Sequence, residues 1–149
     1  MSLIRLTGAA LLVVSTAAAA NTHLFDGPAS ANDLLTAAQA FSMLPVERHG
    51  QSLHLSWSIA PGYYLYRQRI KVETLAPSAA GVEAIRLPDG IAHHDDHFGD
   101  VEIYRNDLEA DVPLSATPSA PLRVRVTYQG CADAGVCYPP QTVVQTIAP

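Results

Sequence analysis

Two cysteines, Cys131 and Cys137, are the residues of this 149-residue chain best suited to chemistry, and the sequence holds no others. Five residues separate them, and the alternation of apolar and polar residues over Leu122–Tyr128 predicts a β-strand leading into the first. We therefore expect the pair to flank a hairpin loop between two neighbouring strands. A disulfide there would close a ring of about seven residues, to which chain entropy assigns only about 2.4 kcal/mol of stabilisation. A bond that stabilises so little, in an exposed turn containing glycine, is better suited to be made and broken.

The charges near the pair bear on its reactivity. Free thiols have a pKa of about 8.5, and the pKa of a reactive thiol is normally lowered by a helix N-terminus, a cation or a metal. None of these is evident in the sequence, where the local charge is Asp133, a carboxylate that disfavours a second negative charge on sulfur. This predicts a cysteine that stays protonated until a partner docks, as suits a carrier of reducing equivalents in an oxidising compartment. An inert structural disulfide remains open, because export makes such bridges common.

The first twenty residues predict the compartment. Arg5 gives a positive start, Leu11–Val14 an apolar stretch, and Ala18–Ala20 small residues for cleavage, which is the pattern of a secretory signal peptide over residues 1–20. An ordinary N-terminal helix is the alternative. Cleavage would leave eight basic and fourteen acidic residues, a net charge of −6 at pH 7. An acidic chain without basic clusters argues against nucleic acid and anionic membranes as partners.

The rest of the chain predicts a single all-β domain. Residues 21–40 form an N-terminal lead-in, in which Asp33 could cap a short helix through Leu34, Leu35 and Ala38. Residues 41–149 alternate between strand patterns and turns, which favours an immunoglobulin-like antiparallel β-sandwich. Trp57 on an early strand is most simply a core residue. The expected strands are Leu53–Ile59, Tyr64–Val72, Val82–Leu87, Val101–Tyr104, Leu108–Leu114, Leu122–Tyr128 and Thr142–Ile147.

Four segments, in order along the chain, carry a resemblance to a known family. The cysteines lie in Tyr128–Pro140 (YQGCADAGVCYPP), which resembles the active-site segment of the N-terminal periplasmic domain of the thiol:disulfide interchange protein DsbD. Gly62–Arg67 (GYYLYR), Glu102–Arg105 (EIYR) and Leu53–Trp57 (LHLSW) agree with the same family. The resemblance covers residues 41 to 147.

This resemblance implies a fold, an activity and partners. The family domain is immunoglobulin-like and takes electrons from the thioredoxin-like C-terminal domain of DsbD. It passes them to periplasmic acceptors such as the disulfide isomerase DsbC and the thioredoxin-like cytochrome c maturation protein. By position, Cys137 matches the cysteine that forms mixed disulfides, and Cys131 matches its resolving neighbour. The resemblance implies no metal, nucleotide or flavin, and a periplasmic location either as an exported protein or as a domain of a larger inner-membrane protein.

The resemblance also implies a loop that covers the cysteines. Residues 95–99, which we term the cap loop, match a family loop that shields the disulfide until a partner displaces it. The aromatic residue usual at its centre is replaced by His97, and Phe98 takes the next position before Gly99. Either Phe98 covers the cysteines, or His97 makes a more polar lid that responds to pH.

Further site residues follow from the same resemblance. Asp95 and Asp96 match acidic residues near the family's active site, where they would keep the cysteine pKa high. Tyr64 and Tyr66 match tyrosines that line it, although packing within a strand would explain either one alone.

The histidines suggest a different function. His93, Asp95 and His97 would share one face of an extended segment, and exported β-sandwiches can carry zinc or copper. Adjacent ligands in one loop seldom reach tetrahedral geometry without a distant fourth ligand, and none is evident. No metal is therefore expected. An exported binding module with a structural disulfide, or a metal carrier, remains the alternative to a redox domain, because the fold alone does not determine function.

Overall fold

A computed structural model describes residues 34–77 and 80–149. The expected signal peptide, the Asp33 cap and residues 21–33 of the lead-in lie outside these residues. In the part that is described, no helix is long and apolar enough to cross a membrane. The elements are α1 (Ala37–Ala40), β1 (Phe41–Met43), β2 (Glu47–His49), β3 (Ser52–Ile59), β4 (Tyr63–Tyr66), the 3₁₀ helix η2 (Arg67–Arg69), β5 (Lys71–Leu75), β6 (Ile91–Asp95), β7 (Gly99–Tyr104), β8 (Asp107–Pro113), β9 (Leu122–Tyr128), β10 (Gly130–Ala132) and β11 (Gln141–Ile147).

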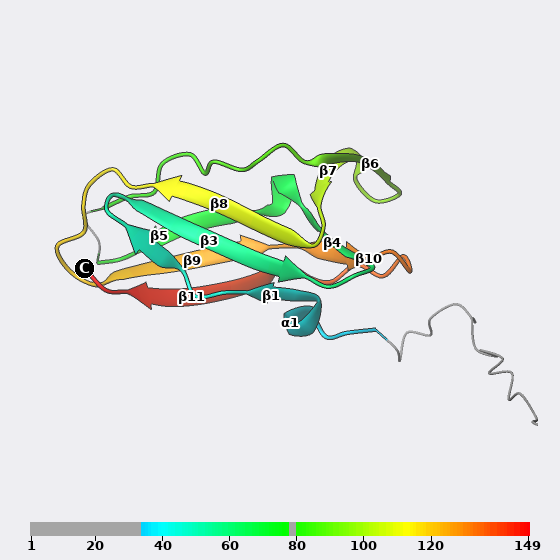
Figure 1. Cartoon of the computed structure of the whole chain (residues 1–149), viewed down its shortest axis with the longest axis horizontal. Helices are drawn as coiled ribbons and strands as arrows, with labels where there is room; N and C mark the ends of the chain where they lie inside the picture. The colour runs from blue at the N-terminus through cyan, green and yellow to red at the C-terminus, as the bar shows by residue number, and fades with distance from the viewer. Residues whose placement is uncertain (1–33, 78–79) are drawn as a thin grey trace, which may run out of the picture.

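Two antiparallel sheets run along the long axis of the molecule (Figure 1). In one, β3 pairs with β8 along one edge and with β1 and β2 along the other. In the other, β9 lies between β5 and β11. Every second residue of β3 and β9 is buried, so each strand turns one apolar face inward. This is the predicted antiparallel β-sandwich of immunoglobulin-like type.

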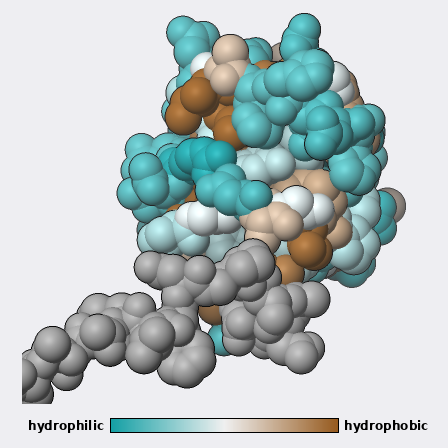
Figure 2. Space-filling model, turned by 90° about the vertical axis from the view of Figure 1, so that its right-hand side faces the viewer, coloured by the Kyte–Doolittle hydropathy of each residue, from teal (hydrophilic) through white to brown (hydrophobic). Residues whose placement is uncertain are grey.

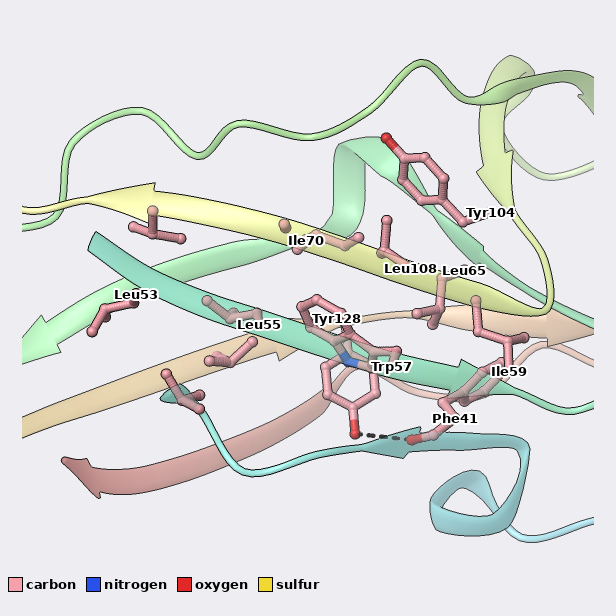
Figure 3. Close-up of a cluster of buried hydrophobic side chains, with 14 of the residues drawn as sticks. Phe41, Leu53, Leu55, Trp57, Ile59, Leu65, Ile70, Tyr104, Leu108 and Tyr128 are labelled. Carbon is pink, nitrogen blue, oxygen red and sulfur yellow. Dashed lines mark hydrogen bonds between the residues drawn. The ribbon is translucent and has the colours of Figure 1, made fainter. Parts of the chain in front are cut away.

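The core lies between these two sheets and is rich in aromatic residues (Figure 3). Trp57 of β3 is 1% exposed, and its ring meets that of Tyr128 on β9 edge-on, with centroids 5.8 Å apart. The Tyr128 hydroxyl donates a hydrogen bond to the carbonyl oxygen of Phe41, which ties β9 to β1. Trp57 is thus a core residue, as its position in an alternating strand predicted.

A third sheet, in the order β10-β4-β7-β6, forms one end of the sandwich. All four residues of β4 are buried, because neighbours cover it on both faces. β10 can approach β4 only because residue 130 is glycine. A Cβ atom there would clash with the carbonyl oxygen of Tyr64 and lie 2.7 Å from the Phe41 ring. The close approach brings Cys131 directly opposite Tyr64.

Most of the predicted strands are confirmed, but two strand predictions and the predicted start of the helix are wrong. Tyr64–Val72 is not one strand: η2 breaks it, and the chain passes from β4 in the third sheet to β5 beside β9. Val82–Leu87 makes only two isolated bridges, from Val82 to Leu114 just after β8 and from Arg86 to Asp111 within β8. The helix of the lead-in begins later than predicted, at Ala37, after Thr36, whose N–H group donates to the Gln39 side chain.

Candidate redox site

Cys131 and Cys137 form a disulfide across a tight hairpin. Cys131 lies in β10, and a four-residue turn leads back to Cys137, which bridges to it in antiparallel fashion. The turn is closed by a hydrogen bond from Ala132 N–H to Val136 O, and Gly135 provides its positive φ of 81°. β9 and β11 pair on either side of this segment, so the predicted hairpin loop is confirmed.

The two sulfurs differ in exposure. The side chain of Cys131 is 0% exposed and packs against Tyr64, Tyr66 and Ile103, whereas Cys137 is partly exposed. The expectation that both cysteines lie in an exposed turn is therefore wrong for Cys131. The reason is the pairing of β10 with β4, which places the first cysteine inside the sheet. Cys137 is therefore the more accessible residue of the pair.

Tyr66 connects the disulfide to a buried carboxylate. Its hydroxyl donates a 2.5 Å hydrogen bond to Asp95 Oδ2, and its oxygen lies 3.0 Å from Cys131 Sγ and 3.8 Å from Cys137 Sγ. The hydroxyl has one proton, and a carboxylate is a stronger acceptor than a disulfide sulfur. The oxygen lone pairs therefore remain available to a Cys131 thiol after reduction. Burial, followed by the hydrogen bond to Asp95, raises the pKa of Tyr66 far above its ordinary value, so this hydroxyl stays protonated.

Asp95, at the end of β6, is 6% exposed and receives four hydrogen bonds. Oδ1 accepts the N–H groups of His97 and Phe98 at 2.8 and 3.0 Å, and Oδ2 accepts the hydroxyls of Tyr66 and Tyr64. Burial acts to raise the pKa of Asp95, but these hydrogen bonds outweigh it and hold the pKa below its usual value. A buried negative charge thus lies next to the cysteines. It opposes a thiolate on either sulfur and stabilises the thiol.

The cap loop turns between β6 and β7 directly beside the disulfide. Phe98 meets the Tyr66 ring edge-on at 5.1 Å. Like Cys137, it packs against the buried cysteine cluster, which consists of Tyr64, Tyr66, Ile103 and Cys131. The His97 side chain is 65% exposed, with Nδ1 3.9 Å from Asp95 Oδ1. The two candidates for covering the cysteines lie differently: Phe98 packs against the cluster that contains Cys131, whereas His97 lines the cleft that contains Cys137. Gly99 has a φ of 70°, which lets the chain reverse into β7.

A cleft of about 240 Å³ separates the cap loop from the cysteine turn. Cys137 and Tyr64 lie in its wall, and Asp96 lines it from the cap side without being buried. This end of the molecule presents mostly hydrophilic residues with smaller hydrophobic patches between them (Figure 2). The remaining lining residues are His93, His94, Asp95, His97, Ala132, Asp133 and Gly135.

Two cations near the site were missed by the sequence reasoning. Arg105 holds Asp133 through two hydrogen bonds of 2.7 and 3.0 Å and lies 5.1 Å from the centroid of the Tyr64 ring. The charge of Asp133 is therefore compensated, and Asp95 is the carboxylate that influences the sulfurs. Arg69 lies over the Phe98 ring. Arg105 could have been suspected, because it ends one of the segments that carry the family resemblance, whereas Arg69 follows the break in the strand that the sequence did not reveal.

The histidines next to the cap loop make separate contacts. His93 packs against the Tyr64 ring at 5.0 Å, and His94 Nδ1 lies 2.7 Å from Asp100 Oδ1. Throughout residues 34–77 and 80–149, no group of three or more His, Cys, Asp or Glu side chains is placed to hold a metal ion. The geometry of the described residues gives the metal-carrier alternative no support.

Comparison with known proteins gives consistent results. The family model described as thiol:disulfide interchange protein DsbD, N-terminal, matches residues 31–149. DsbD of Yersinia pestis is 48% identical over 106 residues, which is 71% of this chain and 17% of that protein. DsbD of Citrobacter koseri is 44% identical over 133 residues, which is 89% of this chain and 22% of that protein. The chain thus spans about a fifth of the length of these curated relatives.

Solved structures agree in fold. The crystal structure of the Neisseria meningitidis DsbD N-terminal domain in the reduced form superposes with a TM-score of 0.74 at 29% identity, covering 81% of this chain and 94% of that one. A structure of the complex between the DsbD N-terminal and the PilB N-terminal domains from Neisseria meningitidis superposes with a TM-score of 0.66 at 29% identity. The match covers 77% of this chain and 88% of that one. The family match over nearly the whole described chain, the identities and the shared fold lead to one conclusion: this chain belongs to the family of N-terminal domains of the thiol:disulfide interchange protein DsbD.

Proposed function

We propose that this chain relays reducing equivalents by thiol-disulfide exchange through Cys131 and Cys137, as the protein-disulfide reductase component of a larger system. The donor would be a thioredoxin-like domain of the DsbD C-terminal type. The acceptors would be periplasmic thioredoxin-fold proteins, among them a DsbC-type isomerase and a thioredoxin-like cytochrome c maturation protein. The observation that carries the proposal is the asymmetry of the disulfide: Cys137 reaches the wall of a cleft, and Cys131 lies buried beneath it beside Tyr66.

The asymmetry supports a different role for each sulfur. In the loading step, a donor thiolate attacks Cys137 Sγ, and the bond to Cys131 breaks. Cys131 leaves as a thiolate and takes up a proton. The second thiol of the donor then attacks the donor sulfur that is bonded to Cys137 Sγ. Cys137 leaves as a thiolate, so the donor is oxidised and Cys137 is reduced. Two electrons have passed to this chain, and the donor has gained the disulfide that this chain has lost.

The delivery step runs in the opposite sense. The Cys137 thiolate attacks the acceptor disulfide and forms a mixed disulfide, and one acceptor sulfur leaves. Cys131 then gives up its proton and attacks Cys137 Sγ, which releases the second acceptor sulfur and restores the intramolecular disulfide. The buried carboxylate of Asp95 keeps the thiols protonated between encounters, so exchange with stray disulfides is slow.

The surroundings of the disulfide support encounters with proteins. Phe98 covers the cysteine cluster from the cap side, so a partner must displace the cap loop or enter the cleft beside it. The similar DsbD N-terminal domain of Neisseria meningitidis forms a complex with a PilB N-terminal domain. By analogy, this chain would dock its partners over Cys137. The predicted signal peptide, or membership of a larger inner-membrane protein, would place the exchange in the periplasm.

A trapping experiment tests the proposal. In the Cys131→Ala variant, Cys137 can form a mixed disulfide with a partner but cannot resolve it. We expect a covalent adduct when Cys137, activated as its mixed disulfide with 5-thio-2-nitrobenzoate, meets a purified thioredoxin-like domain whose resolving cysteine is replaced by alanine. The attacking thiolate displaces thionitrobenzoate, and the adduct should be reversible by dithiothreitol and absent from the Cys131→Ala/Cys137→Ala control. If a thioredoxin-fold protein known to undergo exchange gives no adduct, the relay is refuted and the alternative of an exported binding module with a structural disulfide gains support.

A further inference from the structure

Arg69 is placed to control the cap loop. It ends η2, and its guanidinium carbon lies 4.3 Å from the centroid of the Phe98 ring. A cation over an aromatic ring is attracted by the negative face of the ring. Arg67, two residues earlier, is held by Glu102 at 2.7 Å, but among the described residues Arg69 makes no ion pair or side-chain hydrogen bond. Its contact with Phe98 is therefore its main interaction within this part of the chain.

Phe98 transmits this contact to the disulfide. Its ring meets Tyr66 edge-on, and its N–H group donates to Asp95 Oδ1. Tyr66 in turn lies 3.0 Å from Cys131 Sγ. A guanidinium that holds the Phe98 ring thus holds the side chain that covers the cysteine cluster from the cap side.

Arg69 also borders a small basic hollow of about 100 Å³. Lys71 lines the same hollow, and like Arg69 it makes no ion pair among the described residues. The amide of Gln129, which also lines it, donates to the carbonyl oxygen of Tyr138, the residue after Cys137. Two cations together in a chain of net charge −5 favour a carboxylate, which arginine can bind through two parallel hydrogen bonds. The other lining residues are Thr127 and Pro140.

We propose that Arg69 positions the cap loop through Phe98, and that the basic hollow receives a carboxylate of the docking thioredoxin-fold protein, which draws the guanidinium off the ring. The cap loop is then loosened only where a partner is already bound next to Cys137. The positioning role concerns this chain alone, whereas the carboxylate contact rests on the proposed function.

The positioning role is tested by thiol accessibility in the reduced protein. The rate of alkylation by iodoacetamide is measured from pH 7 to 11, which separates the thiol pKa from the limiting rate of the thiolate. We expect Arg69→Gln to raise the limiting rate about two- to fivefold, the population change that an exposed cation–π contact of about 0.5–1 kcal/mol produces. Arg69→Lys should restore part of the protection. Arg123→Gln removes an exposed arginine at the start of β9, at the far end of the sandwich, and should change nothing (Figure 1).

A double-mutant cycle asks whether Arg69 acts through Phe98. Phe98→Ala should itself raise the limiting rate, and adding Arg69→Gln to it should raise the rate no further. Full additivity of the two substitutions, or an Arg69→Gln rate equal to that of the unsubstituted protein, would refute the positioning role. A general loosening of the fold is distinguished by urea unfolding, where Arg69→Gln should lower the free energy of unfolding, relative to Arg123→Gln, by no more than the lost contact itself, which the two- to fivefold change sets at about 0.5–1 kcal/mol.

The carboxylate contact is tested on Lys71, which does not touch Phe98. Lys71→Gln should lower the second-order rate of reduction by a purified thioredoxin-like DsbD domain about two- to fivefold, as for an exposed ion pair, and weaken its dependence on salt. Its alkylation rate should stay unchanged, and Arg123→Gln should affect neither rate. An unchanged transfer rate with the Lys71 variant would refute the docking contact and leave the relay intact, whereas failure of the unsubstituted protein to transfer electrons would refute the relay itself.

Discussion

The hydroxyl oxygen of Tyr66 lies 3.0 Å from Sγ of Cys131, in a position that a thiol proton can reach once the disulfide is reduced. The same hydroxyl donates its own proton to Asp95, so a reduced Cys131 can become the first donor in a chain of hydrogen bonds that ends on a buried carboxylate. Such a chain stabilises the protonated thiol. Such a chain would keep the proposed dithiol unreactive between encounters with its partners.

The bond between Tyr66 and Asp95 should contribute measurably to stability. A hydrogen bond to a charged group contributes about 1.5–3 kcal/mol, against about 0.5–1.5 kcal/mol for a neutral pair. We expect Tyr66→Phe to lower the free energy of unfolding by the larger amount. Tyr128→Phe is the matched control, because its hydroxyl donates to the neutral carbonyl of Phe41. Urea unfolding of the oxidised proteins measures both, and an equal loss in the two variants would contradict an ionised Asp95.

The lowered pKa of Asp95 predicts how stability depends on pH. Because the folded pKa lies below the unfolded value of about 3.9, this carboxylate stabilises the fold fully above that value and loses its contribution as the pH falls through the folded pKa. Asp95→Asn removes the titrating group. The stability lost in the variant should therefore be greatest near pH 6 and should shrink below pH 4. Urea unfolding between pH 3 and 6 tests this, and a difference that stays constant over the range would contradict it.

Alternating strands such as β3 and β9 could be predicted because one face of each packs into the core, and the pattern of apolar residues records that burial. The break at η2 could not be predicted, because the alternating pattern of Tyr64, Tyr66 and Ile70 continues across it. β6 was missed because three of its five residues are polar and its one large apolar residue, Ile91, is exposed. It is an edge strand that pairs with β7. Which of His97 and Phe98 faces the cysteines depends on the turn that Asp95 organises by accepting both of their N–H groups, and no spacing in the sequence reveals that turn.

The close approach of β10 to β4 makes Gly130 a sensitive position. An added Cβ would meet the backbone carbonyl of Tyr64 and the Phe41 ring, and a backbone atom cannot move aside as a flexible side chain can. We expect Gly130→Ala to lower the free energy of unfolding by about 3 kcal/mol, at the upper end for overpacking. At Gly81 an added Cβ would meet only the Ser115 hydroxyl at 3.6 Å, so Gly81→Ala should be nearly neutral. Thermal unfolding compares the two, and a Gly130 variant as stable as the Gly81 variant would show that β10 can shift without cost.

The unequal burial of the two sulfurs predicts an order of reaction. In the oxidised protein, Cys131 is buried in one cluster with Tyr64, Tyr66 and Ile103, whereas Cys137 borders the cleft. Reactivity of a thiol requires both ionisation and access, and the buried carboxylate of Asp95 opposes ionisation most strongly where water is absent. Brief treatment with iodoacetamide should therefore modify Cys137 at least about tenfold faster than Cys131. Peptide mapping by mass spectrometry measures the ratio, with the urea-unfolded protein as the control in which the two rates become equal. Equal rates in the folded protein would mean that the attacking and resolving roles are not determined by burial.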